Sequence, residues 1–299
     1  MLVSILLPTY NRLDMLKKAL DSAINQTYKD IEILVGDNCS EDGTEAYMLE
    51  EMKKDSRIKY HRWEENIGAY NNTARLITKI KGEYFVFMND DDWLDLNYVE
   101  ECVKFIKANE GYAFVTPSII LYREDYKYEK ACYVPDITSD SAEKRIRIQL
   151  RNYWNSDVVS GFFSKQVLTD MEKYDGYYFK KRIIEDVIFM IRALAVGKGK
   201  VLSHVHYNKL NNGKTRVLEN ITSDYCDTTG ITRKNFTKTC IKCICDTIKN
   251  DKIFSKSIKN PKLFAWYIDV YLNYVWQSYS IMKIFRIINL IILYKRVYT

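Results

Sequence analysis

Three adjacent carboxylates, Asp90-Asp91-Asp92, directly follow the apolar run from Tyr84 to Met88. Neighbouring carboxylates repel one another, and each loses solvation at the edge of a sheet. Mg²⁺ and Mn²⁺ prefer carboxylate and phosphate oxygens, and Mg²⁺ commonly binds through one or two carboxylates together with substrate phosphates. The triplet therefore indicates a metal site. The alternative is a solvated acidic turn in which Asp92 caps the next helix.

Two further groups of residues could take part in chemistry. Glu185-Asp186 begins a helical pattern. These acids either complement the helix dipole or supply a general base that takes a proton from an attacking hydroxyl. His204 and His206 alternate in an apparent strand and therefore point to the same side. His206 could bind a metal or a phosphate, and its alternative is a structural role in the strand.

Apolar runs and helical spacing alternate through the first part of the chain. Continuous apolar runs are typical of strands that are covered on both faces, and apolar residues that recur at helical spacing are typical of helices. Strands separated by helix-length segments imply right-handed crossovers and a mostly parallel sheet. The predicted strands are Leu2 to Leu7, Ile31 to Val35, Ile58 to Trp63, Tyr84 to Met88 and Tyr112 to Val115, and the predicted helices are Leu13 to Ile24, Thr44 to Lys54, Ala69 to Ile80 and Tyr98 to Ala108.

Polar clusters follow three of these predicted strands. They are Thr9 to Arg12, Asp37-Asn38 and Asn89 to Asp92. In open α/β sheets, ligands bind beyond the carboxyl ends of the strands. We therefore expect the three clusters to converge on one rim.

The second part of the chain is less regular. We expect strands near residues 119–134, a helix at 141–153, a helix from 186 to 195 and a strand from 201 to 207, with mainly helical structure from about 218. The segment 281–299 is apolar and basic, but its uncharged part is shorter than the roughly 20 residues that span a bilayer. It either lies on a membrane surface or packs on the domain.

The overall composition excludes some classes of protein. A net charge of +6 over 299 residues is a mild excess, and no long basic tract interleaved with aromatic residues is present, so we expect no nucleic-acid partner. The seven cysteines are odd in number and mostly scattered, which favours a reducing compartment. The start of the chain lacks the pattern of a secretory signal. We therefore expect a cytoplasmic protein that could contact the inner face of the cell membrane.

Several short motifs occur together in a specific order. They are Val3 to Asn11, Leu20 to Tyr28, Ile31 to Ser40, Glu65 to Gly68, Gly82 to Tyr84 and Asn89 to Trp93. In order and spacing this set resembles the inverting family 2 glycosyltransferases of GT-A fold, over about the first 110 residues. The resemblance implies a Rossmann-like, mostly parallel α/β sheet flanked by helices. The helical pattern from about residue 218 adds a mainly helical C-terminal extension.

The resemblance also implies roles for individual residues. The first loop would hold the nucleotide, Asp37 would accept a base N–H, and Asn66 and Gly68 would lie beside the donor. Together with our reading of the rim, the predicted nucleotide-sugar site is Pro8, Thr9, Tyr10, Asn11, Arg12, Asp37, Asn38, Asn66, Gly68, Asn72, Asn89 and Asp90.

The family's D-x-D position corresponds to Asn89-Asp90-Asp91, with Asn where the family often has Asp. Asp91 would then be the leading ligand for Mn²⁺ or Mg²⁺, and Asp92 and His206 are further candidates. Asp186 would be the general base, and Glu185 is the second choice.

The sequence thus predicts a transferase domain at residues 1–215 and a helical region at 216–299. Within the domain, residues 1–110 would bind nucleotide and 111–215 would bind acceptor. The predicted activity is inverting transfer of a sugar from a UDP-sugar to a hydroxyl of a glycan or lipid-linked oligosaccharide in cell-surface glycan synthesis. One alternative is a sugar-1-phosphate nucleotidyltransferase, although the loop 8–12 lacks the glycines of that class. Another is a non-catalytic, membrane-associated scaffold of the same fold.

Overall fold

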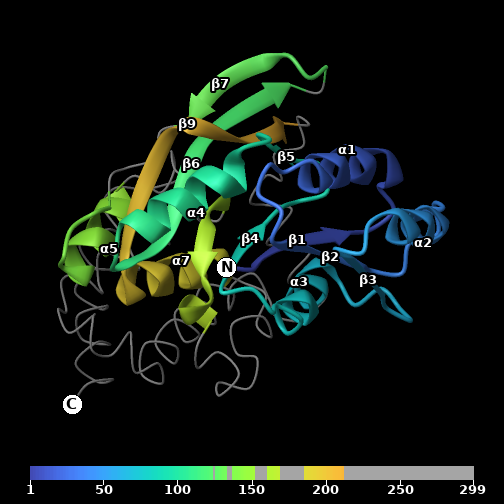
Figure 1. Cartoon of the computed structure of the whole chain (residues 1–299), viewed down its shortest axis with the longest axis horizontal. Helices are drawn as coiled ribbons and strands as arrows, with labels where there is room; N and C mark the ends of the chain where they lie inside the picture. Colours follow the sequence, from blue (N-terminus) through green and yellow to red (C-terminus); the bar gives the residue numbers. More distant parts are fainter. Residues whose placement is uncertain (124, 133–136, 152–159, 169–184, 212–299) are drawn as a thin grey trace, which may run out of the picture.

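The computed structural model describes residues 1–123, 125–132, 137–151, 160–168 and 185–211 (Figure 1). These residues form a nine-stranded mixed sheet flanked by helices. The strand order is β3-β2-β1-β4-β8-β6-β9-β5, and β7 pairs with β6.

The first half alternates strands and helices as predicted. Its elements are β1 (Val3–Thr9), α1 (Leu13–Ile24), β2 (Ile31–Asp37), α2 (Thr44–Lys54), β3 (Ile58–Arg62), α3 (Ala69–Ile77) and β4 (Tyr84–Phe87). All pairings among β3, β2, β1 and β4 are parallel. Every residue of β2 is buried, which explains why it is mostly apolar, and the one carboxylate inside the run, Glu32, accepts the hydroxyl of Ser4 in β1. The carboxyl ends of these strands therefore lie along one edge of the sheet.

The second half extends the sheet with strands of both directions. Its elements are β5 (Trp93–Leu94), α4 (Tyr98–Ala108), β6 (Tyr112–Arg123), β7 (Tyr128–Cys132), α5 (Ala142–Arg151), β8 (Phe162–Ser164), the 3₁₀ helix η3 (Lys165–Leu168), α7 (Glu185–Val196) and β9 (Lys198–Asn211). β8 is antiparallel to both β4 and β6, so it joins the two halves. The sequence did not predict β8, because three residues are too few to show a strand period.

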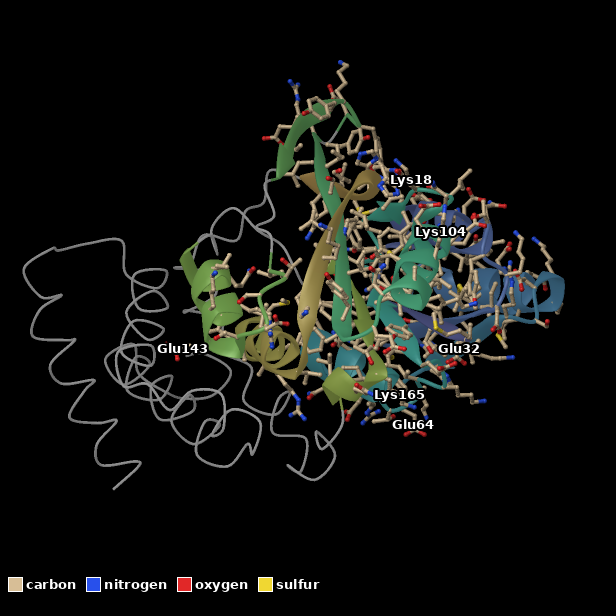
Figure 2. The ribbon with its side chains drawn as sticks, turned by 60° about the vertical axis from the view of Figure 1, so that its left-hand side comes forward. Lys18, Glu32, Glu64, Lys104, Glu143 and Lys165 are labelled. Carbon is tan, nitrogen blue, oxygen red and sulfur yellow. The ribbon has the colours of Figure 1, made fainter. Side chains whose placement is uncertain are left out.

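The hairpin of β6 and β7 projects from the sheet beside α1 (Figure 1). The ammonium of Lys18, on α1, lies 3.4 Å from the ring centroid of Trp93 and 3.6 Å from that of Tyr126 at the hairpin tip. Figure 2 shows Lys18 at this junction. A cation over two aromatic faces is attracted by their quadrupoles, so these contacts tie the hairpin to the first half.

Aromatic packing fixes the direction of α7. Phe189 packs against Phe87 at the end of β4, with ring centroids 5.3 Å apart. Gly197, just after the helix, lies so close to Ala113 near the start of β6 that a Cβ there would approach the Ala113 Cβ to 2.7 Å. β4 and β6 run in the same direction because each is antiparallel to β8. α7 therefore runs against them, and its first residue, Glu185, lies toward their carboxyl ends.

Some predictions concern residues outside the described ranges. The boundary at 215/216, the helical region 216–299 and the basic, apolar segment 281–299 all lie there, so they stay predictions. In the described part of the chain, no helix is both long enough and apolar enough to cross a membrane.

Phe163 should be a main support of the junction between the two halves. It is fully buried, and its ring contacts those of Phe85, Phe114 and Phe189. We expect Phe163→Ala to lower the free energy of unfolding by about 3–5 kcal/mol, because it leaves a cavity at this junction. Phe163→Leu should cost clearly less than Phe163→Ala, because it leaves a smaller cavity. Equal losses for the two variants in denaturant titrations would contradict this role.

Candidate functional site

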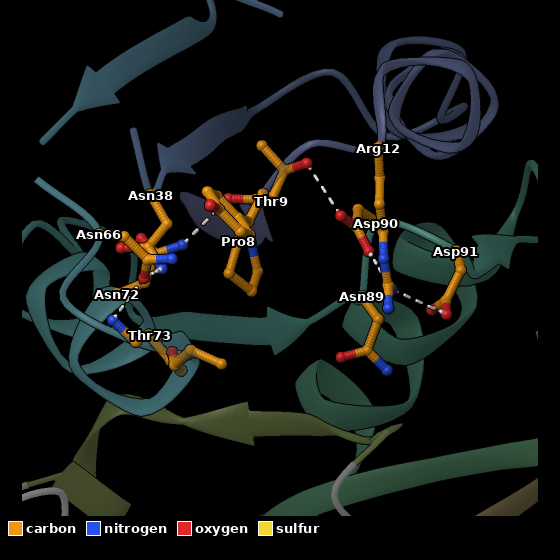
Figure 3. A pocket seen from close by; sticks show the side chains of 13 residues that line it. Pro8, Thr9, Arg12, Asn38, Asn66, Asn72, Thr73, Asn89, Asp90 and Asp91 are labelled. Carbon is orange, nitrogen blue, oxygen red and sulfur yellow. Dashed lines mark hydrogen bonds and ion pairs between the residues drawn. The ribbon is translucent and has the colours of Figure 1, made fainter. Parts of the chain in front are cut away.

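A pocket of about 690 Å³ lies at the carboxyl ends of β1, β2 and β4 (Figure 3). Segments far apart in the sequence meet there. Its lining residues are Pro8, Thr9, Tyr10, Arg12, Asn38, Asn66, Gly68, Ala69, Asn72, Thr73, Asn89, Asp90 and Asp91. The three polar clusters predicted to share a rim thus all contribute to one pocket. The sequence did not single out Ala69 and Thr73, which lie in the first two turns of α3.

Side-chain amides form one wall of the pocket. The Asn38 amide donates to Asn66 Oδ1 at 2.6 Å, and Asn38 Oδ1 accepts the backbone N–H of Ile67 at 2.9 Å. Asn66 Oδ1 also accepts the N–H of Gly68 at 2.9 Å. Gly68 has a φ of 81°, in the region that favours glycine. The loop before α3 is therefore held against the end of β2 by amide hydrogen bonds.

Asn72 fixes the position of α3 against the sheet. Its amide donates to the carbonyl of Gly36 at 2.8 Å, and its Oδ1 accepts the indole N–H of Trp63 at 2.7 Å. A Cβ at Gly36 would come within 2.5 Å of Asn72 Oδ1 and 2.7 Å of Leu76. Only glycine at this position lets the helix approach so closely.

The opposite wall is acidic, and the first loop compensates its charge. Thr9 Oγ1 donates to Asp90 Oδ2 at 2.8 Å. One nitrogen of Arg12, Nη1, donates to Asp90 Oδ1 at 3.1 Å and to Asp91 Oδ2 at 3.2 Å (Figure 3). Burial raises the pKa of Asp90, and the contacts with Arg12 and Thr9 act in the opposite direction. This wall is therefore suited to hold positive charge.

Asp92 and His206, both predicted metal ligands, are bound to other protein groups, and their predicted role stays a prediction. Asp92 Oδ2 accepts hydrogen bonds from the Asn89 amide at 2.8 Å and from Tyr207 Oη at 3.0 Å. Burial raises the pKa of Asp92 to about 7. His206 Nδ1 lies 2.7 Å from Asp95 Oδ2. Among the described residues, neither Asp92 nor His206 belongs to the pocket lining.

Asn11 and Asp37 connect the first two loops instead of facing the pocket. Asn11, with a φ of 50°, accepts the N–H of Glu41 through Oδ1 at 2.8 Å. Its own N–H donates to Ser40 Oγ at 2.9 Å. Asp37 is fully buried, and its oxygens accept the N–H of Ser40 at 2.8 Å and the hydroxyl of Tyr60 at 2.5 Å. Both residues thus hold the loop at 40–41 in place beside the pocket.

The backbone of Glu185-Asp186 forms the first turn of α7, at the same edge of the sheet as the pocket. Their side chains lie outside the part of the chain that the structure describes. Their predicted catalytic roles therefore stay predictions.

The oxygen atoms that could bind a metal ion in the pocket fit one kind of site. In the described ranges, no group of three or more His, Cys, Asp or Glu side chains is arranged to hold an ion. The pocket offers the carboxylates of Asp90 and Asp91. Mg²⁺ is commonly bound by one or two carboxylates together with substrate phosphates and water. The residues thus suit a divalent cation that arrives with a diphosphate.

The mixed α/β sheet, with its polar pocket at the carboxyl ends of the first strands, is the architecture of a GT-A glycosyltransferase. Residues 4–167 match the model of glycosyl transferase family 2, which is more than half of the chain. The protein belongs to this family.

One curated relative is the GalNAc(5)-diNAcBac-PP-undecaprenol beta-1,3-glucosyltransferase of Campylobacter jejuni. It is 29% identical over 180 residues, which are 59% of this chain and 56% of the relative. The chain thus matches little more than half the length of that protein.

Solved structures share the fold at low sequence identity. Residues 1–349 of S. aureus TarS in complex with UDP-GlcNAc superpose with a TM-score of 0.60 at 15% identity, covering 99% of this chain and 90% of that one. The Pyrobaculum calidifontis mannosyltransferase PcManGT, in complex with GDP-Man and Mn²⁺, gives a TM-score of 0.52 at 14% identity over 99% of this chain and 81% of that one.

Asp92 should make stability depend on pH in a known direction. Its pKa is about 7 in the folded protein and about 3.9 in an unfolded chain. Between these values the folded state holds a proton that the unfolded state has lost, so wild-type stability falls as pH rises through this window. Asp92→Asn removes this term. Its free energy of unfolding relative to wild type should rise by on the order of 4 kcal/mol from about pH 4 to about pH 8.

Denaturant titrations with a chelator present measure this difference. Asp14→Asn is the control, since the Asp14 side chain is 97% exposed. A difference between Asp92→Asn and wild type that does not change with pH would contradict the assignment.

Proposed function

We propose that this protein transfers a hexosyl group from a UDP-sugar to an acceptor hydroxyl, with inversion at the anomeric carbon. The observation that carries the proposal is the single pocket in which the first loop, the amide wall and the acidic turn meet. Membership of glycosyl transferase family 2 and the fold shared with a UDP-GlcNAc complex support it.

The nucleoside would lie between the first loop and the amide wall. Tyr10 lines the pocket and is 42% exposed, so its ring is accessible for stacking on a base. Asn38 and Asn66 offer amide groups that can both donate and accept hydrogen bonds, as recognition of uracil requires. Asp37, expected from the sequence to accept the base N–H, would act indirectly, because its oxygens hold Ser40 and Tyr60.

The diphosphate would lie against Arg12 and the acidic turn. Arg12 is half-exposed, so its guanidinium can shift toward phosphate oxygens, which it binds in a bidentate manner. Asp91, with Asp90 beside it, would hold a divalent cation. When bound, that cation neutralises the charge that develops on the departing diphosphate.

The acceptor would enter from the α7 side of the pocket. The carboxylate of Asp186 would take the proton of the acceptor hydroxyl as its oxygen bonds to the anomeric carbon. The bond from that carbon to the diphosphate oxygen breaks on the opposite face, so UDP leaves and the configuration inverts. Glu185 is the second choice for the base.

The acceptor is proposed to be a growing glycan of the bacterial cell surface. The name of the Campylobacter jejuni relative describes glucosyl transfer to an undecaprenol-linked oligosaccharide. A lipid-linked acceptor would suit a cytoplasmic enzyme that contacts the inner face of the membrane. The segment 281–299 is the candidate for that contact.

Calorimetry of UDP binding with and without Mn²⁺ tests the donor site. Wild-type protein should bind UDP more tightly with Mn²⁺, and Asp91→Ala should lose at least about tenfold of that affinity, because it removes the expected ligand. Asp14→Ala, at an exposed carboxylate, should bind as wild type does. A protein that binds no UDP under either condition contradicts the donor assignment and favours a non-catalytic role.

Asp186→Asn should separate binding from turnover. The amide keeps the shape of the carboxylate but cannot take the proton, so turnover should fall by about 10²–10⁴-fold. UDP affinity should stay within about twofold of wild type, since a base on the acceptor side makes no contact with UDP. Release of UDP from UDP-hexoses in the presence of acceptor measures turnover. If Glu185→Gln is inactive and Asp186→Asn active, Glu185 is the base.

A further inference from the structure

Two carboxylates of the acidic segment attach it to β9. Asp92 Oδ1 accepts the backbone N–H of Leu210 at 3.3 Å, and Asp92 Oδ2 accepts the hydroxyl of Tyr207 at 3.0 Å. Asp95 Oδ2 accepts the N–H of His206 at 3.0 Å. The segment that carries Asp90 and Asp91 is thus bound to a strand more than 100 residues later in the chain.

Tyr207 joins both ends of the acidic turn through one atom. Its Oη donates to Asp92 Oδ2 and accepts the backbone N–H of Asn89 at 3.3 Å. The Asn89 amide also donates to Asp92 Oδ2 at 2.8 Å, which closes a ring of three hydrogen bonds. Tyr207 is 1% exposed, so water does not compete for these bonds.

The backbone leaves the sheet at this point. The N–H of Met88 still donates to Leu6 in β1 at 2.9 Å, whereas the next N–H, of Asn89, donates to Tyr207 Oη. The N–H of Asp92 then donates to the carbonyl of Asn89 at 3.2 Å and closes the turn. The hydroxyl of Tyr207 therefore accepts the first backbone N–H beyond the end of the β-ladder.

The turn is held from two sides. On the pocket side, Thr9 and the half-exposed Arg12 bind Asp90. On the far side, the buried Tyr207 binds Asn89 and Asp92. The orientation of Asp91 depends on how firmly the turn is fixed, and a small cation such as Mg²⁺ demands near-ideal ligand geometry.

We propose that Tyr207 is a positioning residue for the cation and diphosphate site, acting through Asp92 and Asn89 on the turn that carries Asp90 and Asp91. This role rests on the proposed function of the pocket. Tyr207 touches neither the cation nor the donor. It fixes the turn so that the carboxylate of Asp91 is already in place when the cation and diphosphate arrive.

Tyr207→Phe tests this role, because phenylalanine keeps the ring and removes only the hydroxyl. The matched control is Tyr98→Phe, since Tyr98 is also fully buried but donates to the carbonyl of Ser160, at 3.5 Å, away from the turn. For both variants we would measure the thermal midpoint, the UDP affinity with Mn²⁺, and the Mn²⁺ concentration that gives half-maximal UDP binding.

We expect Tyr207→Phe to weaken Mn²⁺-dependent UDP binding about tenfold and to raise the half-maximal Mn²⁺ concentration to a similar extent, as loss of groups that orient metal ligands usually does. Tyr98→Phe should bind as wild type does. Amide hydrogen exchange in residues 88–95 should quicken in Tyr207→Phe and not in Tyr98→Phe. This exchange can be read well below the thermal midpoint, so a loss of global stability does not obscure it.

The outcomes separate this inference from the proposed function. If wild type binds UDP and Tyr207→Phe matches it in UDP and Mn²⁺ dependence, the positioning role is wrong and the donor site stands. Equal weakening in both variants also overturns the role, since loss of any buried hydroxyl would then suffice. If wild type binds neither UDP nor Mn²⁺ alone, the proposed function fails, and the positioning role fails with it.

Discussion

Asp90 and Asp92 follow the end of a buried strand and have almost no solvent to stabilise their charge. Burial raises the pKa of both carboxyl groups. Each is compensated from a different part of the chain: Asp90 by the first loop, through Arg12 and Thr9, and Asp92 by β9, through the charge of Lys209 and the hydroxyl of Tyr207. The acidic turn, which forms one wall of the pocket, is therefore stabilised by contacts from both halves of the domain.

This compensation explains why neighbouring acids have different roles. Asp90 and Asp91 both line the pocket beside Arg12, whereas Asp92 does not belong to the lining. Asp90 and Asp92 also hold the turn in place, through their hydrogen bonds with Thr9 and Tyr207. Adjacent acids at the edge of a sheet can thus differ in environment, with two carboxylates lining the pocket and the third bound by a distant strand.

The parallel half of the fold and most of the pocket lining followed from the sequence. The runs in β1, β2 and β4 are mostly apolar because both faces are covered, with the buried Ser4 and Glu32 bonded to each other. Each polar cluster comes at the end of its strand. What the sequence could not provide was the direction of side chains whose partners are distant. Asp92 depends on Tyr207, 115 residues later, and no local pattern distinguishes it from Asp91. Asp37 was expected to accept an N–H of the nucleobase, but in the structure its oxygens accept hydrogen bonds from Ser40 and Tyr60. β8 was missed because its three residues gain their place only from β4 and β6.

The insertion of β8 between β4 and β6 has a consequence for biosynthesis. β3, β2, β1 and β4 can pair once residue 87 has left the ribosome, but the second edge of β4 must wait for Phe162 to Ser164. During that interval the nascent chain presents an unpaired, largely apolar strand edge, which is a template for association with other chains. At roughly 5–20 residues per second the delay lasts several seconds on the ribosome. Chaperone demand during synthesis should therefore concentrate on this window.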